Sequence, residues 1–302
     1  MKRRAFIAGL GSAAAWPLAA RAQQREQMRR IGVLMPNDEN DPRISTYVSV
    51  FTQALADLGW TDGRNVRVDF RWVGDDTHRI RALAQELVGL QPDLILAGGT
   101  PGTRALQRET RTIPIVFASV AEPVASGIVA QLDRPSGNVT GFALFEPSLG
   151  GKWFELLSEI APGLNRAAIM FSPDITPVSI YMPSLEMAAR LLKVEPIIAP
   201  VHSDVEIETA IILAATRNNV PAVYPLSEFA RDGGLLSYGY DPVDNFRRAA
   251  TYVDRILHGA KPGDLPVQFA TKFEMVVNRK TAAALGLAIP PSIRLRADEV
   301  IE

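Results

Sequence analysis

From position 31 onward, short runs of apolar, β-favouring residues alternate with amphipathic stretches of helical length. This alternation predicts repeated strand–helix units, which form parallel sheets with helices on both faces. A first series has expected strands at 31–35, 66–70, 94–97, 113–117 and 139–142, with helices at 43–58, 77–88 and from about 100 to 108. The spacing between these strands favours parallel pairing because each connection is long enough for a crossover helix.

The alternation then begins again after an expected helix at 147–160. Further strands are predicted at 167–171, 195–201, 222–224 and 235–238, with helices at 177–192 and 205–216. A helix at 243–257, a strand at 273–277 and a helix at 279–285 close the chain. We therefore predict an α/β protein of two Rossmann-like lobes, the first made of 29–141 and 240–265 and the second of 142–239 and 266–302.

The beginning of the chain has a different pattern, typical of an export signal. Arg3-Arg4-Ala5-Phe6-Ile7 precedes an apolar segment without acidic residues, and Ala20-Arg21-Ala22 follows it. This arrangement predicts a twin-arginine-like signal at 1–22, cleaved near Ala22, on an apolar segment too short to span a bilayer. The alternative, an amphipathic terminal helix, is disfavoured because Trp16-Pro17 would interrupt it.

Composition narrows the classes of function. The chain has 47% hydrophobic residues, a formal net charge of −1 and no cysteine. The near-neutral charge, without a basic run, argues against a nucleic-acid surface. The lack of cysteine excludes disulfides, thiolate zinc sites and a lipid-modified cysteine anchor. With the predicted signal, this favours a protein free in the periplasm.

Ligands of open parallel sheets bind beyond the carboxyl ends of the strands, where helix N-termini favour anions. Gly99 and Thr100 follow one expected strand and open a helix, so they can hold a ligand or simply cap that helix. Ser119 and Glu122 follow the next strand, where Glu122 can receive an amino group. An ordinary helix start explains both segments equally well. Further candidates at strand ends are Met35, Asn37, Phe142, Ser172 and Tyr224.

Evidence for catalysis is weak. His78, His202 and His258 have no partner at metal-ligand or catalytic-triad spacing. The sequence contains no Gly-x-Ser-x-Gly, P-loop or His-Glu-x-x-His motif. We therefore assign no catalytic residue, no metal and no cofactor.

Several motifs together carry a family resemblance over nearly the whole length. They are the leader 3–7 with 16–23, then 233–239 (GGLLSYG), 252–257 (YVDRIL) with 259–262 (GAKP), 271–274 (TKFE), 283–287 (AALGL) and 297–301 (ADEVI). With these motifs the chain resembles the ABC transporter substrate-binding family related to tryptophan- and tyrosine-type binding proteins. The resemblance implies a type I periplasmic binding fold that closes on a small molecule and docks to an inner-membrane permease.

The chain departs from the family pattern between Ile211 and Leu213. The family usually has further residues there, including the end of a helix, a buried strand and a loop into the next helix. Here the helix after Ser203-Asp204 continues directly into 213–219. We therefore expect a second lobe that is one strand short.

The leading hypothesis is a monomeric solute receptor of an ABC importer, which binds an amino acid or an aromatic-like molecule by hinge closure and has no catalytic activity. A ligand-sensing module for a membrane signalling partner is the second hypothesis. An exported doubly wound enzyme is the third, and the missing nucleophile and metal motifs argue against it.

Overall fold

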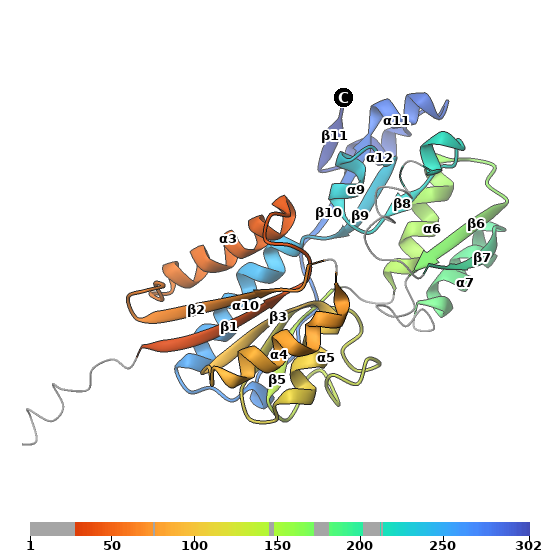
Figure 1. Cartoon of the computed structure of the whole chain (residues 1–302). Helices are drawn as coiled ribbons and strands as arrows, with labels where there is room; N and C mark the ends of the chain where they lie inside the picture. Colours follow the sequence, from red (N-terminus) through yellow and green to blue (C-terminus); the bar gives the residue numbers. More distant parts are fainter. Residues whose placement is uncertain (1–27, 75, 145–147, 172–180, 202–211, 213) are drawn as a thin grey trace, which may run out of the picture.

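The structure, a computed structural model, describes residues 28–302 apart from 75, 145–147, 172–180, 202–211 and 213. Two α/β lobes lie side by side (Figure 1). The chain passes between them after β5, after β9 and before β10. The expected export signal lies outside the described residues.

The first lobe is built around a five-stranded parallel sheet of order β2-β1-β3-β4-β5. Its strands are β1 (Arg29–Met35), β2 (Val66–Trp72), β3 (Leu94–Gly98), β4 (Ile115–Val120) and β5 (Val139–Ala143), and its helices are α3 (Pro42–Asp57), η1 (Thr77–Arg79), α4 (Ile80–Gly89), α5 (Gly99–Glu109), α10 (Pro242–Leu257) and η3 (Pro262–Asp264). The predicted strands and their parallel pairing are confirmed here.

Two apolar layers cover this sheet. Phe51 of α3 and Phe246 of α10 belong to the layer on one face, while Leu87 of α4 and Leu106 of α5 belong to the layer on the other. Strand β3 is buried along its whole length as a result. Complete burial on both faces explains why the central strands read as continuous apolar runs rather than as alternating ones.

Gly141 is required by the close approach of β4 and β5. Its backbone φ is +153°, and a Cβ atom at this position would lie 2.1 Å from the Phe117 carbonyl oxygen. No other residue fits this geometry without displacing the strand. The glycine thus secures the edge of the sheet at which the chain leaves the first lobe.

The second lobe contains two separate sheets in the described part of the chain. One has the order β11-β10-β9-β8 and the other pairs β6 with β7 in parallel. The strands are β6 (Arg166–Phe171), β7 (Glu195–Pro200), β8 (Val223–Tyr224), β9 (Leu236–Tyr240), β10 (Phe273–Asn278) and β11 (Glu299–Ile301), and the helices are α6 (Leu149–Ile160), α7 (Met182–Leu192), α9 (Ser227–Arg231), α11 (Arg279–Ala284) and α12 (Pro291–Arg296).

The expectation of a shortened second lobe agrees with this division. Lobe 1 has β3 between β1 and β4, whereas β6 and β8 do not pair with a common strand among the described residues. In lobe 1 five consecutive positions of β1 are buried, but only Ala167 is buried in β6. Met170 and Ile198 are 49% and 46% exposed. A central strand and the helix that follows it would cover such surfaces in a complete sheet.

Where the chain passes between the lobes, several contacts tie the crossing segments together. The Asp241 amide donates to the Lys272 carbonyl at 3.0 Å, and Lys272 Nζ lies 2.8 Å from Asp241 Oδ2. Val267 and Gln268, which the sequence places in the second lobe, hydrogen-bond to first-lobe carbonyls at Leu132 and Gly141. The exact lobe limits stay a prediction. These contacts place Val267 and Gln268 beside the first lobe, and Tyr240 lies at the end of β9 in the second-lobe sheet.

Asp241 also caps α10, and its carboxylate accepts the Val243 amide at 2.9 Å. We expect Asp241→Ala to lower the free energy of unfolding by about 1–2 kcal/mol, the usual cost of losing an N-cap. Lys272→Ala should cost less than about 1 kcal/mol because its side chain is exposed and such ion pairs contribute little. Urea unfolding of both variants measures this difference, and equal losses would contradict a capping role.

Candidate functional site

The loop after β4 has an unusual backbone. Ser119 and Glu122 have φ values of +62° and +45°, and a bulge interrupts the pairing of β4 with β5 at Ser119. Positive φ is uncommon outside glycine and is typical of functional sites, where surrounding structure maintains it. Both residues are among the positions predicted from the sequence.

Helix α5 begins beside this loop. The Thr100 hydroxyl is buried and accepts the Ala121 amide at 3.1 Å, so it holds the loop against the helix. Gly98 precedes the helix and offers no side-chain cap, and Gly99 has a φ of +74°. The first amides of α5 therefore lack a side-chain acceptor from the N-cap, and an N-terminus of this kind favours a negatively charged group.

Polar side chains from both lobes meet next to the loop. We call this group the inter-lobe cluster; it consists of Tyr47, Ser119 and Glu122 from the first lobe and Tyr181, Glu228 and Tyr240 from the second. The Tyr47 hydroxyl donates to Glu228 Oε1 at 3.1 Å. Ser119 lies beside the Tyr240 phenol, and Glu122 lies beside Tyr181.

In the first-lobe half of the cluster, Ser119 Oγ and Glu122 Oε1 are shielded from solvent without a well-formed hydrogen bond. A buried polar atom without a partner is costly, so native proteins rarely retain one unless a ligand or water completes it. These two atoms are therefore candidates to bind a polar group of a ligand.

Burial controls the charge state of the cluster. Burial raises the pKa of Glu122, and the neighbouring Tyr181 hydroxyl only partly offsets this. Burial also raises the pKa values of Tyr47, Tyr181 and Tyr240, in each case with nearby carboxylates adding to the effect. The three phenols thus stay protonated and act as hydrogen-bond donors near neutral pH.

A pocket of about 410 Å³ lies at the mouth between the lobes. It is lined by Asp41, Pro42 and Arg43 at the start of α3 and by Ile212, Glu228, Phe229 and Asp232 of the second lobe. Burial alone would raise the pKa of Asp41, but hydrogen bonds from Arg43 and its positive charge lower it overall. Asp41 therefore stays ionised and keeps Arg43 in place.

The other predicted positions lie at varying distances from this cluster. Met35 and Phe142 are fully buried in the first-lobe core, and the Phe142 ring packs 4.7 Å from that of Tyr252. Asn37 has a φ of +63° and bridges to Gly74 at the ends of β1 and β2. Tyr224 stacks behind Phe229 at 5.2 Å, and burial raises its pKa to about 12. Ser172 lies outside the described residues.

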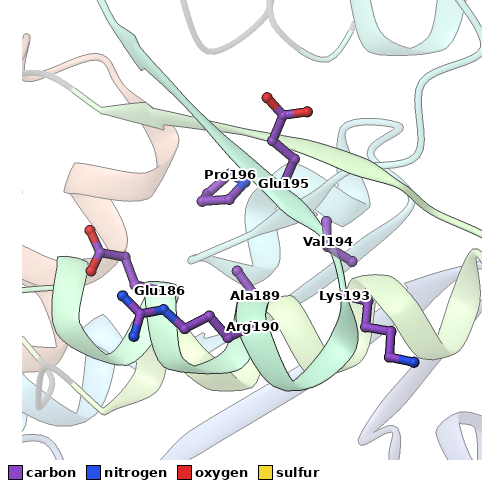
Figure 2. Close-up of a pocket in the computed structure, with 7 residues that line it drawn as sticks. All are labelled: Glu186, Ala189, Arg190, Lys193, Val194, Glu195 and Pro196. Atoms are coloured by element: carbon purple, nitrogen blue, oxygen red, sulfur yellow. The ribbon is translucent and has the colours of Figure 1, made fainter.

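A second depression of about 470 Å³ lies between α7 and β7 (Figure 2). Glu186 and Arg190 lie together on α7, while Lys193 and Glu195 point away from them. Because this surface is at the amino end of β7, it faces away from the side on which parallel sheets bind ligands. Its charged groups do not converge, which argues against a site for a small molecule.

Sequence reasoning missed Tyr47, Tyr181, Glu228 and Tyr240. Tyr240 ends a strand at the carboxyl side of the sheet, so the strand-end rule could have selected it. Tyr47 and Glu228 are at helix positions that resemble ordinary surface positions, and only the approach of the two lobes identifies them. No local signal was available for these two.

Other kinds of site receive no support from the described part of the chain. It contains no group of three or more His, Cys, Asp or Glu residues arranged to hold a metal ion. None of its helices has both the length and the apolar character needed to cross a membrane.

Comparison with known proteins assigns this chain to a family. The family described as ABC transporter substrate binding protein matches residues 39–214 and 193–301. The two matched ranges overlap at 193–214 and together cover most of the chain. Among curated proteins, a tyrosine-binding protein of Clostridioides difficile (strain R20291) is 26% identical over 275 residues, which cover 83% of this chain and 78% of that protein.

Solved structures agree on the fold. A conserved domain protein of Vibrio cholerae has a TM-score of 0.82 and 25% identity, and the match covers 90% of this chain and 99% of that one. An ABC domain in complex with L-Trp from Streptococcus pneumonia has a TM-score of 0.82 and 23% identity, with the same coverage. A ligand-free, open substrate-binding protein of Clostridium difficile has a TM-score of 0.69 and 22% identity, with coverage of 91% and 99%. The expected type I periplasmic binding fold is confirmed.

Proposed function

Because this chain belongs to the ABC transporter substrate-binding protein family, we propose that it is the exported solute receptor of an importer and delivers a small molecule to a membrane permease. Members of this family bind substrates rather than transform them. The receptor works outside the cytoplasmic membrane, after cleavage of the signal near Ala22, and as a monomer. Closure of the two lobes around the solute creates the surface that the permease recognises.

The ligand we propose is a zwitterionic amino acid. Its ammonium group would pair with Glu122, and its carboxylate would bind at the N-terminus of α5, near Gly99 and Thr100. Ser119 would donate to or accept from the same ligand, while Tyr181 and Tyr240 approach it from the second lobe. The side chain would extend toward the pocket at Phe229 and Ile212.

The observation that carries this proposal is the shielded Glu122 Oε1 atom, which lacks a well-formed hydrogen bond. Glu122 is half-buried, and a charged group in such a place is stable only with a partner. An ammonium group of a bound solute supplies that partner with a charge-assisted hydrogen bond. The names of two similar proteins, which bind tyrosine and L-Trp, support the choice of an amino acid.

A thermal-shift series tests the proposal with three matched compounds. L-Tryptophan carries both charged groups, tryptamine lacks the carboxylate, and indole-3-propionic acid lacks the amine. A ligand at 100 times its Kd stabilises the native state by about 2.7 kcal/mol. We expect L-tryptophan or L-tyrosine to raise the Tm by several degrees and each truncated compound to have a much smaller effect.

Two results would contradict the proposal of an amino-acid ligand. If indole-3-propionic acid raised the Tm as much as L-tryptophan, Glu122 would have no role in binding an amine. If none of the twenty amino acids changed a sharp melting transition, the ligand class would be wrong.

A further inference from the structure

One hydrogen bond in the inter-lobe cluster connects the two lobes directly. Tyr47 is on α3 of the first lobe and Glu228 is on α9 of the second, 181 residues later, with 3.1 Å between the phenol oxygen and Oε1. The contact lies at the mouth of the cleft, because Glu228 also lines the pocket there. The hydrogen bond therefore joins the two lobes at the edge of this pocket.

The Tyr47 side is held in position before any ligand binds. Its ring stacks on that of Phe246, with centroids 5.3 Å apart and ring planes at 13°. Phe246 is buried on α10, which packs along α3 in the first-lobe core. The phenol is thus presented by a rigid pair of helices, and it loses little freedom when it forms the hydrogen bond.

Glu228 is also held in position, because its helix is bonded to the second-lobe sheet. Helix α9 is short, but Arg231 on its last turn binds Glu274 of β10 and Glu299 of β11, each at 2.8 Å. Arg231 also donates to the Ser227 hydroxyl at 2.9 Å. These bonds secure the helix to the four-stranded sheet, so Glu228 moves with the second lobe as a whole.

A second tyrosine and glutamate lie beside each other across the cleft, although Glu122 Oε1 has no well-formed hydrogen bond. Here the carboxylate, Glu122, comes from the first lobe and the phenol, Tyr181, from the second. The two pairs thus place one tyrosine and one glutamate on each lobe. Opening the lobes separates both pairs and exposes both carboxylates to water.

We propose that the Tyr47–Glu228 hydrogen bond is a latch that favours the closed arrangement of the two lobes. The proposal rests on the receptor function given above. An incoming solute amine would bind Glu122, whereas the Tyr47–Glu228 bond is compatible with bound ligand. The Tyr47–Glu228 bond therefore stabilises closure both with and without ligand, and its loss favours the open receptor.

Tyr47→Phe tests the latch because it removes one oxygen atom and retains the stacked ring. The chain has no cysteine, so Ala56→Cys on α3 and Lys280→Cys on α11 provide two exposed labelling sites for a fluorescent energy-transfer pair. Tyr252→Phe is the matched control, since its hydroxyl donates to the Pro266 carbonyl within the first lobe. Each variant is measured without ligand and then with L-tryptophan.

In the ligand-free protein, we expect Tyr47→Phe to increase the ratio of open to closed molecules about tenfold, with a larger inter-lobe separation. Tyr252→Phe should leave that ratio unchanged, and Glu228→Gln, which keeps an acceptor, should have an intermediate effect. An unchanged separation in Tyr47→Phe, or a wild-type protein already open without ligand, would overturn the latch. The ligand-free measurement is independent of solute identity, so an absence of binding to L-tryptophan would count against the proposed function alone.

Discussion

Replacing Glu122 with glutamine is expected to weaken amino-acid binding by 100-fold or more while it stabilises the ligand-free protein. Glutamine has the same shape but cannot neutralise an ammonium group, and loss of one member of a buried charge pair costs about 2–5 kcal/mol. Without ligand, the same substitution removes a half-buried charge whose Oε1 atom has no well-formed hydrogen bond. Stability and function thus oppose each other at this residue, as is common at binding sites.

The pH dependence of the protein's stability follows from the direction of the pKa shift of Glu122. Because burial raises the pKa of Glu122 in the folded protein, the folded state binds the proton more tightly than the unfolded chain does. The resulting stabilisation is complete below the ordinary carboxyl pKa and is lost as the pH rises through the raised value. Glu122→Gln should therefore exceed the wild type in Tm at neutral pH, and the difference should shrink toward pH 4.

Glu186→Gln is the matched control, because Glu186 is exposed on α7. Calorimetric titration with L-tryptophan and melting curves at several pH values measure both effects. Wild-type affinity in Glu122→Gln would remove Glu122 from the binding site. A lower Tm at neutral pH would show instead that the carboxylate has a stabilising partner within the protein.

Amide hydrogens of β6 and β7 are expected to exchange roughly 100 to 1,000 times faster than those of β1 and β3. Strand β3 is buried throughout and lies between two other strands. In contrast, β6 and β7 pair only with each other among the described strands, and each carries exposed apolar side chains. A two-stranded sheet is marginal by itself, so local opening should need about 3–4 kcal/mol less free energy here.

Hydrogen exchange followed by mass spectrometry provides an internal control in the same molecule. Strands β9 and β10 are in the second lobe but belong to its four-stranded sheet, where Val276 and Val277 are fully buried. Their exchange should be slow, like that of the first lobe. Equal protection of β6 and β9 would mean that the division of the second sheet does not weaken it.

The alternation of apolar runs and amphipathic stretches was sufficient to predict the first lobe. Its central strands are buried on both faces, so their apolar runs are distinct. The second lobe was predicted less completely. Helix α12 and strand β11 are short and were missed, and the antiparallel pairing of β9 with β10 depends on contacts distant in sequence.

The candidate site was predicted only where the local sequence indicates it. Ser119 and Glu122 follow a buried strand, and the rule on strand ends selects them. Phe142 was chosen by the same reasoning, yet its ring is in the core against Tyr252. The second half of the cluster depends on how the lobes approach each other. Side chains such as Glu228 acquire their role from a residue nearly two hundred positions away, and no local pattern contains that information.

The left-handed backbone at Ser119 and Glu122 also constrains how such a receptor can evolve. Glycine, asparagine and aspartate adopt this conformation readily, whereas β-branched residues do so only with strain. Few substitutions are therefore open to the first lobe at these positions. Tyr181 precedes α7 and Glu228 lies on α9, both with negative φ, where many side chains are acceptable. If the proposed site is correct, new solute preferences should arise mainly from mutations in the second lobe, while the first lobe keeps the groups proposed to bind the charged part of the solute.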